Sequence, residues 1–211
     1  MARELKDRIV QAASTLFFNR GVKSMTMSDI ANELGISKRT LYEVFRDKEE
    51  LIATCVQTHL ERVDQEIDTM VTNSQDVIDT LMRLYAKSLQ NVQNTQKSVM
   101  HDLKKYHASI YRKIECRQKD GLLVFMPLFN QGIKQGLIRD DVNFEILTWL
   151  LKAQFKALMD DEYIPTDKYP IEEFMQVIIL NFIRGIVTPL GNEKVNKIVS
   201  QLAKSKKQTG N

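Results

Sequence analysis

Apolar residues recur at helical spacing along almost the whole of this 211-residue chain, and only four prolines and eight glycines interrupt the pattern. The alternation that a half-buried strand requires is nearly absent. The sequence therefore predicts an all-α protein of about nine or ten helices with short connections. The apolar share of 43% is that of an ordinary globular protein, so a buried core is expected.

Residues 27–46 have the spacing of a helix-turn-helix. Thr26 can cap the first of its two helices, Gly35 stands where the turn favours positive φ, and Ser37 can cap the second helix. Helices this short do not persist alone in water, so they must pack on each other and on a first helix near residues 3–19. Taken alone, the same pattern also fits a plain helical hairpin with solvated charges.

The segment TMSDIANELGISKRTLYEVFRDKEEL, Thr26 to Leu51, decides between these alternatives. It closely resembles the DNA-binding head of TetR-type (tetracycline-repressor-like, TetR/AcrR) transcriptional regulators. The residues that carry the resemblance are Ile30, Ala31, Gly35, Ile36, Ser37, Leu41, Tyr42, Phe45 and Lys48. Val22 departs from the pattern, because an aromatic residue usually follows the glycine there. The resemblance implies a DNA-binding regulator, and a repressor.

A long fourth helix is expected to join two parts of the chain. A capping box at residues 47–50 opens this helix, and its apolar positions continue to Met70. Residues 1–60 are expected to form the helix-turn-helix DNA-binding domain. Residues 61–205 are expected to form a helical ligand-binding and dimerisation domain.

Two adjacent cations at the start of the third helix indicate contact with DNA. Lys38 and Arg39 lie at the end of a recognition helix that enters the major groove. Arg39 can bond bidentately to guanine, Lys38 can reach guanine or phosphate, and Thr40 can touch a thymine methyl group. By resemblance, the phosphate backbone is contacted by Thr26, Tyr42 and Lys48. The full set of expected DNA-binding residues is Thr26, Ser37, Lys38, Arg39, Thr40, Tyr42 and Lys48.

The charges in this region leave one question open. The net charge of the chain is only +3, so any basic surface must be local. Glu43 is unusual on a helix that faces DNA. It can accept a hydrogen bond from cytosine or point outward, and the outward interpretation is favoured.

The remainder of the chain is predicted to form a larger helical bundle. Pro127 lies within a long helical segment, 108–135, and predicts a kink there. A short final helix and a frayed tail from Lys204 are expected at the end. Periodicity and the family resemblance together suggest a cavity that binds a small apolar or amphipathic effector. The residues expected to line it are Met82, Tyr85, Leu89, Met100, Leu103, Tyr106, Phe125 and Phe129.

Two apolar stripes, 146–159 and 171–186, are wide enough for helices that pack on two sides. They also fit two ordinary core helices. In the family that the head resembles, two such helices pair with their copies in a second subunit. The resemblance thus implies a homodimer on a palindromic double-stranded DNA operator, with an interface that includes Leu147, Leu151, Phe155, Phe174, Ile178, Phe182 and Ile183.

Other functions find little support in the sequence. No apolar run approaches the roughly 18 residues that span a bilayer, and we expect a cytoplasmic protein without a membrane partner. No catalytic motif is present, and no cofactor or metal is expected; a metal site at His101, Asp102 and Cys116 is the weak exception. The main alternative is a helical ligand-binding or interaction protein whose helix-turn-helix no longer reads DNA, and an enzyme is a third.

Overall fold

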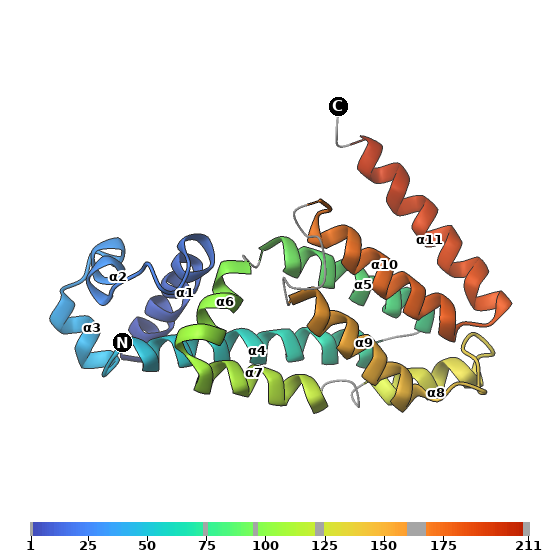
Figure 1. Ribbon diagram of the computed structural model, residues 1–211, viewed down its shortest axis with the longest axis horizontal. Coiled ribbons are helices and arrows are strands. Elements are labelled where there is room, and N and C mark those ends of the chain that lie inside the picture. Colours follow the sequence, from blue (N-terminus) through green and yellow to red (C-terminus); the bar gives the residue numbers. More distant parts are fainter. Residues whose placement is uncertain (1, 74–75, 95–96, 121–124, 160–167, 209–211) are drawn as a thin grey trace. The chain divides into compact units, whose positions relative to one another are not determined.

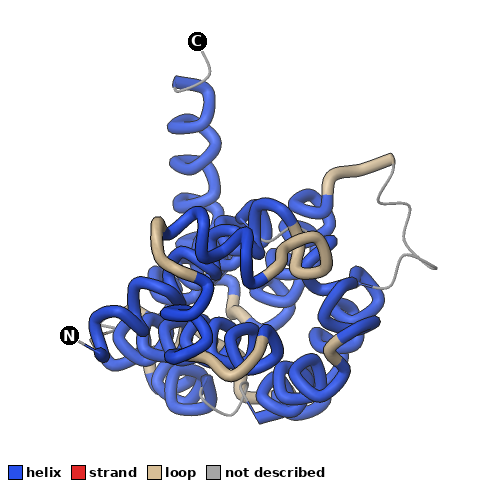
Figure 2. The backbone as a smooth tube through the Cα atoms, turned by 90° about the vertical axis from the view of Figure 1, so that its left-hand side faces the viewer, coloured by secondary structure: helices blue, strands red, loops and turns tan. Residues whose placement is uncertain are grey.

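The computed structural model describes residues 2–73, 76–94, 97–120, 125–159 and 168–208, and these ranges contain eleven helices (Figure 1). The same ranges contain no strand beyond an isolated β-bridge. Helix makes up almost all of the described backbone in Figure 2. The all-α prediction is therefore confirmed, with a helix count of eleven, just above the expected range.

The chain divides into two compact units that are interleaved in sequence. The first comprises Met1–Glu66 and Asn94–Lys119, and the second comprises Ile67–Gln93 and Asp120–Asn211. Helix α4 (Lys48–Thr72) contributes to both units.

This division differs from the one expected near residue 60. Residues 94–119 belong to the compact unit of the N-terminal helices and not to the unit of the C-terminal helices. The assignment of DNA binding to one part of the chain, and of ligand binding and dimerisation to the other, concerns function and stays a prediction.

The first unit contains the three N-terminal helices, the beginning of α4 and two later helices. Their bounds are α1 Ala2–Arg20, α2 Met27–Leu34, α3 Lys38–Val44, α6 Lys97–Tyr106 and α7 Ala108–Asp120. Residues from all of them share one core, which includes Ile9, Phe17, Ile30, Leu41, Phe45, Leu51, Val99, Leu103, Ile110 and Ile114. Helices α6 and α7 therefore complete the core on which α1 to α3 depend.

Local capping residues set the ends of α2 and α3. Thr26 and Asp29 form a capping box: the Asp29 amide donates to Thr26 Oγ1 over 3.2 Å, and the Thr26 amide donates to Asp29 Oδ2 over 2.9 Å. Gly35 follows α2 with φ +64°, a conformation that glycine adopts at low cost. Ser37 Oγ accepts from the Thr40 amide over 3.0 Å and opens α3.

Besides the end of α4, the described residues of the second unit contain five helices. They are the greater part of α5 (Val77–Asn94), then α8 Met126–Lys134, α9 Phe144–Met159, α10 Ile171–Ile186 and α11 Pro189–Gln208. Their common core includes Val77, Ile78, Leu81, Met82, Tyr85, Leu128, Phe129, Ile138, Ile183, Ile186 and Val195.

The turn after α8 packs against the connection between α10 and α11. Gly136 has φ +67°, and Ile138 forms an isolated antiparallel bridge with Val187. Gly191 lies against this turn so closely that a Cβ atom there would stand 2.3 Å from the Leu137 carbonyl oxygen. Any side chain at position 191 would therefore displace α11.

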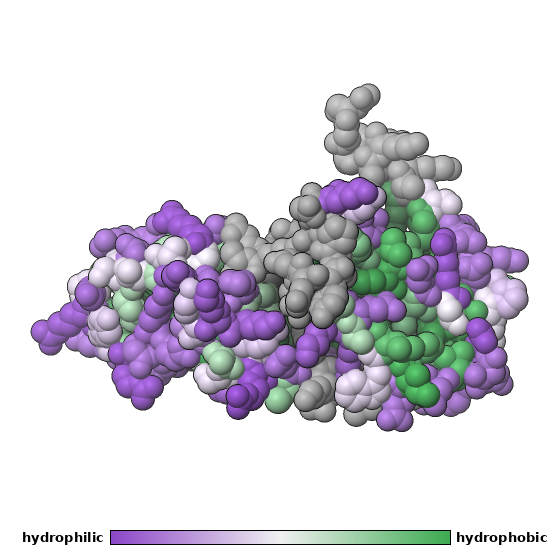
Figure 3. Space-filling view, viewed as in Figure 1, coloured by the Kyte–Doolittle hydropathy of each residue, from purple (hydrophilic) through white to green (hydrophobic). Residues whose placement is uncertain are grey.

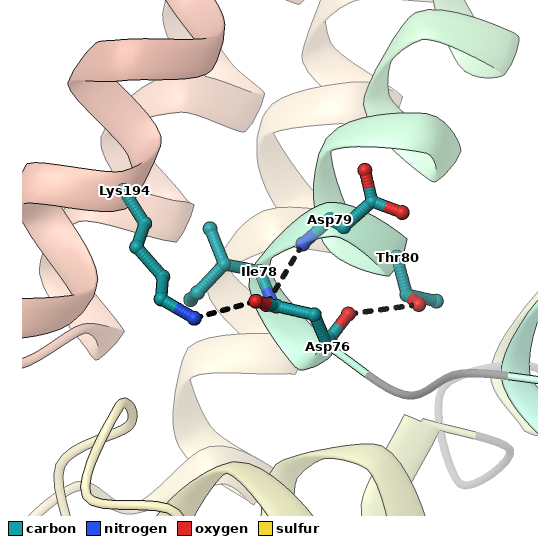
Figure 4. A network of polar contacts seen from close by, with 5 residues as sticks. All are labelled: Asp76, Ile78, Asp79, Thr80 and Lys194. Carbon is teal, nitrogen blue, oxygen red and sulfur yellow. Dashed lines mark hydrogen bonds and ion pairs between the residues drawn. The ribbon is translucent and has the colours of Figure 1, made fainter.

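A polar network connects α11 to the start of α5 (Figure 4). Asp76 Oδ1 accepts from the amides of Ile78 and Asp79 over 2.9 and 3.3 Å, and Lys194 Nζ donates to Asp76 Oδ2. Burial raises the pKa of the Asp76 carboxyl, but the bonds from Lys194 and the two amides outweigh it and leave the pKa below its ordinary value. Asp76 thus caps α5 and also binds α11 through its ion pair with Lys194.

Two sequence predictions about helix ends are wrong. Helix α8 begins at Met126, so Pro127 does not kink the middle of a helix. Proline lies instead in the first turn of α8, where its missing N–H removes no intrahelical hydrogen bond. The final helix is also longer than expected, since α11 has 20 residues and extends to Gln208.

Candidate nucleic-acid interface

The N-terminal end of α3 presents its charged side chains to solvent. Lys38, Arg39 and Thr40 are not buried, whereas Leu41 is fully buried in the first core. The Ser37 and Thr40 hydroxyls bond to each other over 2.8 Å. Packing through Leu41 thus fixes the helix while its first turn stays accessible, as a recognition helix requires.

Arg39 is oriented by a neighbour on its own helix. Its Nε donates to Glu43 Oε1 over 3.0 Å, and the side chains are 89% and 60% exposed. The bond engages Nε and leaves the terminal nitrogens, which are the pair that can bond to the O6 and N7 atoms of guanine. Glu43 therefore faces along the helix toward Arg39, a role that neither sequence interpretation included.

Of two further predicted contacts, Tyr42 lies beside Lys38 on α3 and Thr26 caps α2. Lys38 Nζ is 5.9 Å from the centroid of the Tyr42 ring, which is 44% exposed. Thr26 Oγ1 donates to the Asp29 carboxylate over 2.6 Å. Hydrogen bonds from the Thr26 side chain and amide lower the pKa of Asp29, so this carboxylate is charged throughout the neutral range.

Lys48 is held by the protein at the start of α4. Its Nζ donates to the Val22 carbonyl oxygen over 2.7 Å. Burial lowers the pKa of the ammonium, while the nearby carboxylates of Asp102, Asp29 and Glu49 raise it in part. An ammonium has three donors, so two remain for other acceptors after the bond to Val22.

Sequence reasoning missed the residues of α6 and its end that contact this region. Asp102 Oδ2 accepts from the Lys23 amide over 2.8 Å, and His107 Nδ1 bonds to Glu49. The sequence suggests Asp102 only for a metal site with His101 and Cys116, and no group of metal-binding side chains is found in the part of the chain that the structure describes. Helical periodicity predicts that a face is buried without identifying its partner, so no sequence signal could have found these contacts.

The residues expected to line an effector site do not form one cluster. Met82, Tyr85, Leu89, Phe125 and Phe129 belong to the second core or pack against it. Met100 and Leu103 belong to or pack against the first core, and Tyr106 is 44% exposed. The structure therefore brings together five of the eight.

Three of the seven residues expected at a dimer interface lie in or against the second core, and the other four, Leu151, Phe155, Phe174 and Ile178, are partly exposed. Ile183 is 2% exposed, and Leu147 and Phe182 pack against the second core. The large apolar side chains that are exposed on these two helices are Ile146, Trp149, Leu150 and Val177, at 56%, 55%, 52% and 59%. Figure 3 shows apolar residues gathered over this region.

A hollow lies beside this apolar surface. It has a volume of about 280 Å³ and is lined by Arg139, Asp141, Val142, Asn143, Ile146, Leu147 and Gly185. Arg139 is fixed by a bidentate pair with Asp141, over 2.8 and 2.7 Å, and by a 3.1 Å bond to the Gly185 carbonyl oxygen.

Of the helices within the described residues, none is long and apolar enough to span a membrane.

Comparison with known proteins gives a consistent result. Residues 9–55 match the family model of bacterial regulatory proteins, tetR family. An uncharacterized HTH-type transcriptional regulator, YvaF of Bacillus subtilis, is 25% identical over 180 residues, which is 85% of this chain and 94% of that protein. The HTH-type transcriptional repressor KstR2 of Mycolicibacterium smegmatis is 23% identical over 162 residues, 72% of this chain and 79% of that protein.

A solved structure shares the fold. The ketosteroid transcriptional regulator KstR2 of Mycobacterium tuberculosis superimposes with a TM-score of 0.58 at 22% identity, over 87% of this chain and 95% of that one. Both the matched family and these similar proteins are described as regulators.

Proposed function

Because this chain belongs to the tetR family of bacterial regulatory proteins and is a helix-turn-helix transcriptional regulator, we propose that it is a repressor that acts as a homodimer on a palindromic operator. A small apolar or amphipathic molecule releases it from DNA. The observation that carries this proposal is the exposed first turn of α3, where Lys38 and Arg39 follow the glycine that ends α2 and the serine that caps α3. A protein that reads chromosomal DNA acts in the cytoplasm.

Base recognition rests on Arg39. With Nε bonded to Glu43, the plane of the guanidinium is restrained, and its terminal nitrogens are presented as a pair. A pair of parallel donors matches the two acceptors of guanine in the major groove. Lys38 and Thr40 flank it and make the adjacent contacts.

Backbone contacts come from groups that surround α3. Tyr42 is half exposed on α3, and Lys48 has donors in excess of its bond to Val22. The Thr26 position lies at the start of α2, where helix amides attract phosphate. These contacts fix the register of the protein on DNA and carry no sequence information.

The second subunit covers the exposed apolar side chains of α9 and α10. Four large apolar side chains on neighbouring helices, each more than half exposed, form the kind of surface that marks a protein interface. A second copy is the occupant that DNA binding requires, because two recognition helices must reach half-sites about one helical turn apart. The hollow lined by Arg139 and Ile146 adjoins this surface and offers space for a partner side chain.

The effector binds in the second unit. Met82, Tyr85 and Phe129 lie together there, and a core with a thioether and aromatic rings can repack around an apolar guest. The name of the similar KstR2 protein as a ketosteroid regulator supports a ligand with an extended apolar body. Release requires that the ligand bind the DNA-free conformation more tightly, typically by 1–3 kcal/mol.

Selection from a random duplex library with the purified protein tests DNA recognition. We expect palindromic duplexes with a guanine at equivalent positions of the two half-sites, bound far more tightly than scrambled duplexes of the same composition. Equal affinity for selected and scrambled DNA would instead leave a helical ligand-binding protein as the function.

A thermal-shift screen with steroids, fatty acids and cationic amphiphiles tests the effector. A compound that raises the unfolding temperature is then titrated against the protein bound to its selected operator. A compound that stabilises the protein but leaves operator affinity unchanged would disprove release, because equal affinity for two states shifts neither.

A further inference from the structure

We propose that Asp102 on α6 is a positioning residue for DNA binding, because its carboxylate fixes the turn between α1 and α2, which leads to Thr26 and to which Lys48 of α4 is bonded. The proposal rests on the proposed function, since it concerns the same DNA-binding surface. It adds a residue from a distant part of the sequence that does not itself contact DNA.

Two hydrogen bonds hold the peptide group between Val22 and Lys23, in the turn after α1. The amide of Lys23 donates to Asp102 Oδ2 over 2.8 Å. The carbonyl oxygen of Val22, in the same stretch of backbone, accepts from Lys48 Nζ over 2.7 Å. The turn is thus tied to α6 through its donor and to α4 through its acceptor, and three residues later it ends at the Thr26 cap of α2.

Two further contacts attach the end of α6 to the same region. The Lys23 ammonium lies 5.1 Å from the centroid of the Tyr106 ring. His107, directly after α6, bonds through Nδ1 to the Glu49 carboxylate in the first turn of α4. Beneath these polar contacts Leu103 is buried in the same core as Phe17 and Ile30.

The carboxylates around Lys48 give Asp102 a second and smaller effect, which asparagine would not replace. The carboxylates of Asp102, Asp29 and Glu49 surround an ammonium that is partly removed from water. They raise the pKa of the ammonium and so offset part of the lowering that burial causes. Removal of Asp102 takes away the first of these carboxylates together with the acceptor for the turn.

The spacing of the backbone contacts is what Asp102 controls. Thr26 follows the turn, and Lys48 bonds to it, so both depend on the position of residues 22–25. If the turn moves, these groups lose their register relative to the phosphates while Lys38 and Arg39 keep their place on α3. We therefore expect Asp102 to affect the salt dependence of binding more than base preference.

Three substitutions separate the possible roles of this carboxylate. Asp102→Asn keeps an oxygen in place for the Lys23 amide, Asp102→Glu keeps the charge but displaces the oxygens, and Asp102→Ala removes both. Asp79→Ala is the matched control, because Asp79 is also a partly exposed carboxylate that accepts a bond, from Arg83 over 2.8 Å, but it lies in the second unit. Operator affinity is measured for each variant as a function of salt concentration, with the active fraction determined by stoichiometric titration so that unfolded protein does not count.

For Asp102→Ala we expect operator affinity to fall about tenfold, as for the loss of one charge-assisted hydrogen bond. The slope of log affinity against log salt should fall by about 0.9 for each phosphate that the variant no longer neutralises. Asp102→Asn should recover most of both quantities, Asp102→Glu should not, and Asp79→Ala should match the unchanged protein. Guanine preference should persist in all four variants.

Two results would overturn the proposal. One is wild-type affinity and salt slope in Asp102→Ala, and the other is an Asp102→Asn variant as weak as Asp102→Ala, since the asparagine oxygen would then fail to replace the carboxylate. If the unchanged protein does not distinguish operator from scrambled DNA, it is the proposed function that fails, which this series reveals before any variant is compared.

Discussion

Arg39 Nε donates a hydrogen bond to Glu43 Oε1 over 3.0 Å, one helical turn along α3. The two side chains are 89% and 60% exposed, so the bond contributes little to the stability of the fold. Its significance lies in the direction that it gives the guanidinium, and it leads to two predictions that can be separated.

Arg39→Ala should relax base preference at the guanine of each half-site. Removal of the bidentate pair corresponds to about 1–3 kcal/mol of discrimination. Affinities for the selected operator and for duplexes substituted at that guanine measure the change. Equal loss on both duplexes would show that Arg39 contacts phosphate only.

Glu43→Gln should cause a smaller loss of the same preference, about two- to fivefold, because the restraint on Arg39 Nε is weakened while Arg39 itself remains. The double variant Arg39→Ala with Glu43→Gln should discriminate no worse than Arg39→Ala alone. Additive losses would mean that Glu43 contacts a base independently, as in the cytosine alternative.

Lys48→Ala should weaken binding about uniformly across DNA sequences and lower the salt slope by roughly one unit per subunit. In this variant the Val22 carbonyl oxygen also loses its hydrogen-bond donor, so the unfolding temperature should fall as well. Lys48→Arg keeps the charge and serves as the control. An unchanged slope would remove Lys48 from the backbone contacts and leave its structural role.

Leu150→Glu combined with Val177→Glu should give monomers that keep their helical content and lose operator binding. Both side chains are more than half exposed, so the carboxylates cost little in the protomer and are unfavourable only when a partner covers them. Leu190→Glu, at a 55% exposed position on α11, tests whether any new surface carboxylate has this effect. Sedimentation that shows an intact dimer would place the interface elsewhere.

Cys55 and Cys116 should differ in reactivity at pH 8. Burial raises the pKa of the Cys55 thiol to about 11, whereas Cys116 is exposed. A thiol reagent should modify Cys116 in the native protein and Cys55 only on unfolding of the first unit, as mass spectrometry of the labelled chain can show. Rapid native labelling of both would contradict the buried position of Cys55.

The raised pKa of Cys55 also predicts how the free energy of unfolding changes with pH. The unfolded chain releases the Cys55 proton near the ordinary value of 9.0, and the folded chain releases it only near 11. The unfolded state is therefore favoured progressively as pH rises from about 9 to 11. Cys55→Ser should remove this part of the alkaline destabilisation, at the cost of a hydroxyl in the core.

The ends of α2 and α3 are predictable from the sequence because their signals are local. Thr26, Gly35 and Ser37 each act within four residues, and the structure has each in its expected conformation. The identification of a DNA-binding regulator follows from the same residues and is confirmed by the family match. The specific DNA contacts stay predictions.

Contacts between distant segments are beyond the reach of sequence patterns. Lys23 and Asp102 are 79 positions apart, and nothing in either segment specifies the other. Helices α9 and α10 are apolar on several sides, so periodicity does not tell the inner Ile183 from the outer Val177. The prediction for Pro127 is wrong because proline is as compatible with the first turn of a new helix as with a kink in a continuous one.

The interleaved order of the two units also affects how this protein is made. Ile110 and Ile114, which lie in the core beneath α1 to α3, are synthesised after the whole of α5. At bacterial rates of about 5–20 residues per second, the first helices wait several seconds at the ribosome for the segments that complete their core. For the same reason, a chimera that exchanges operator specificity must carry residues 97–119 with the first 66, because a head transplanted without them leaves part of its own interior behind.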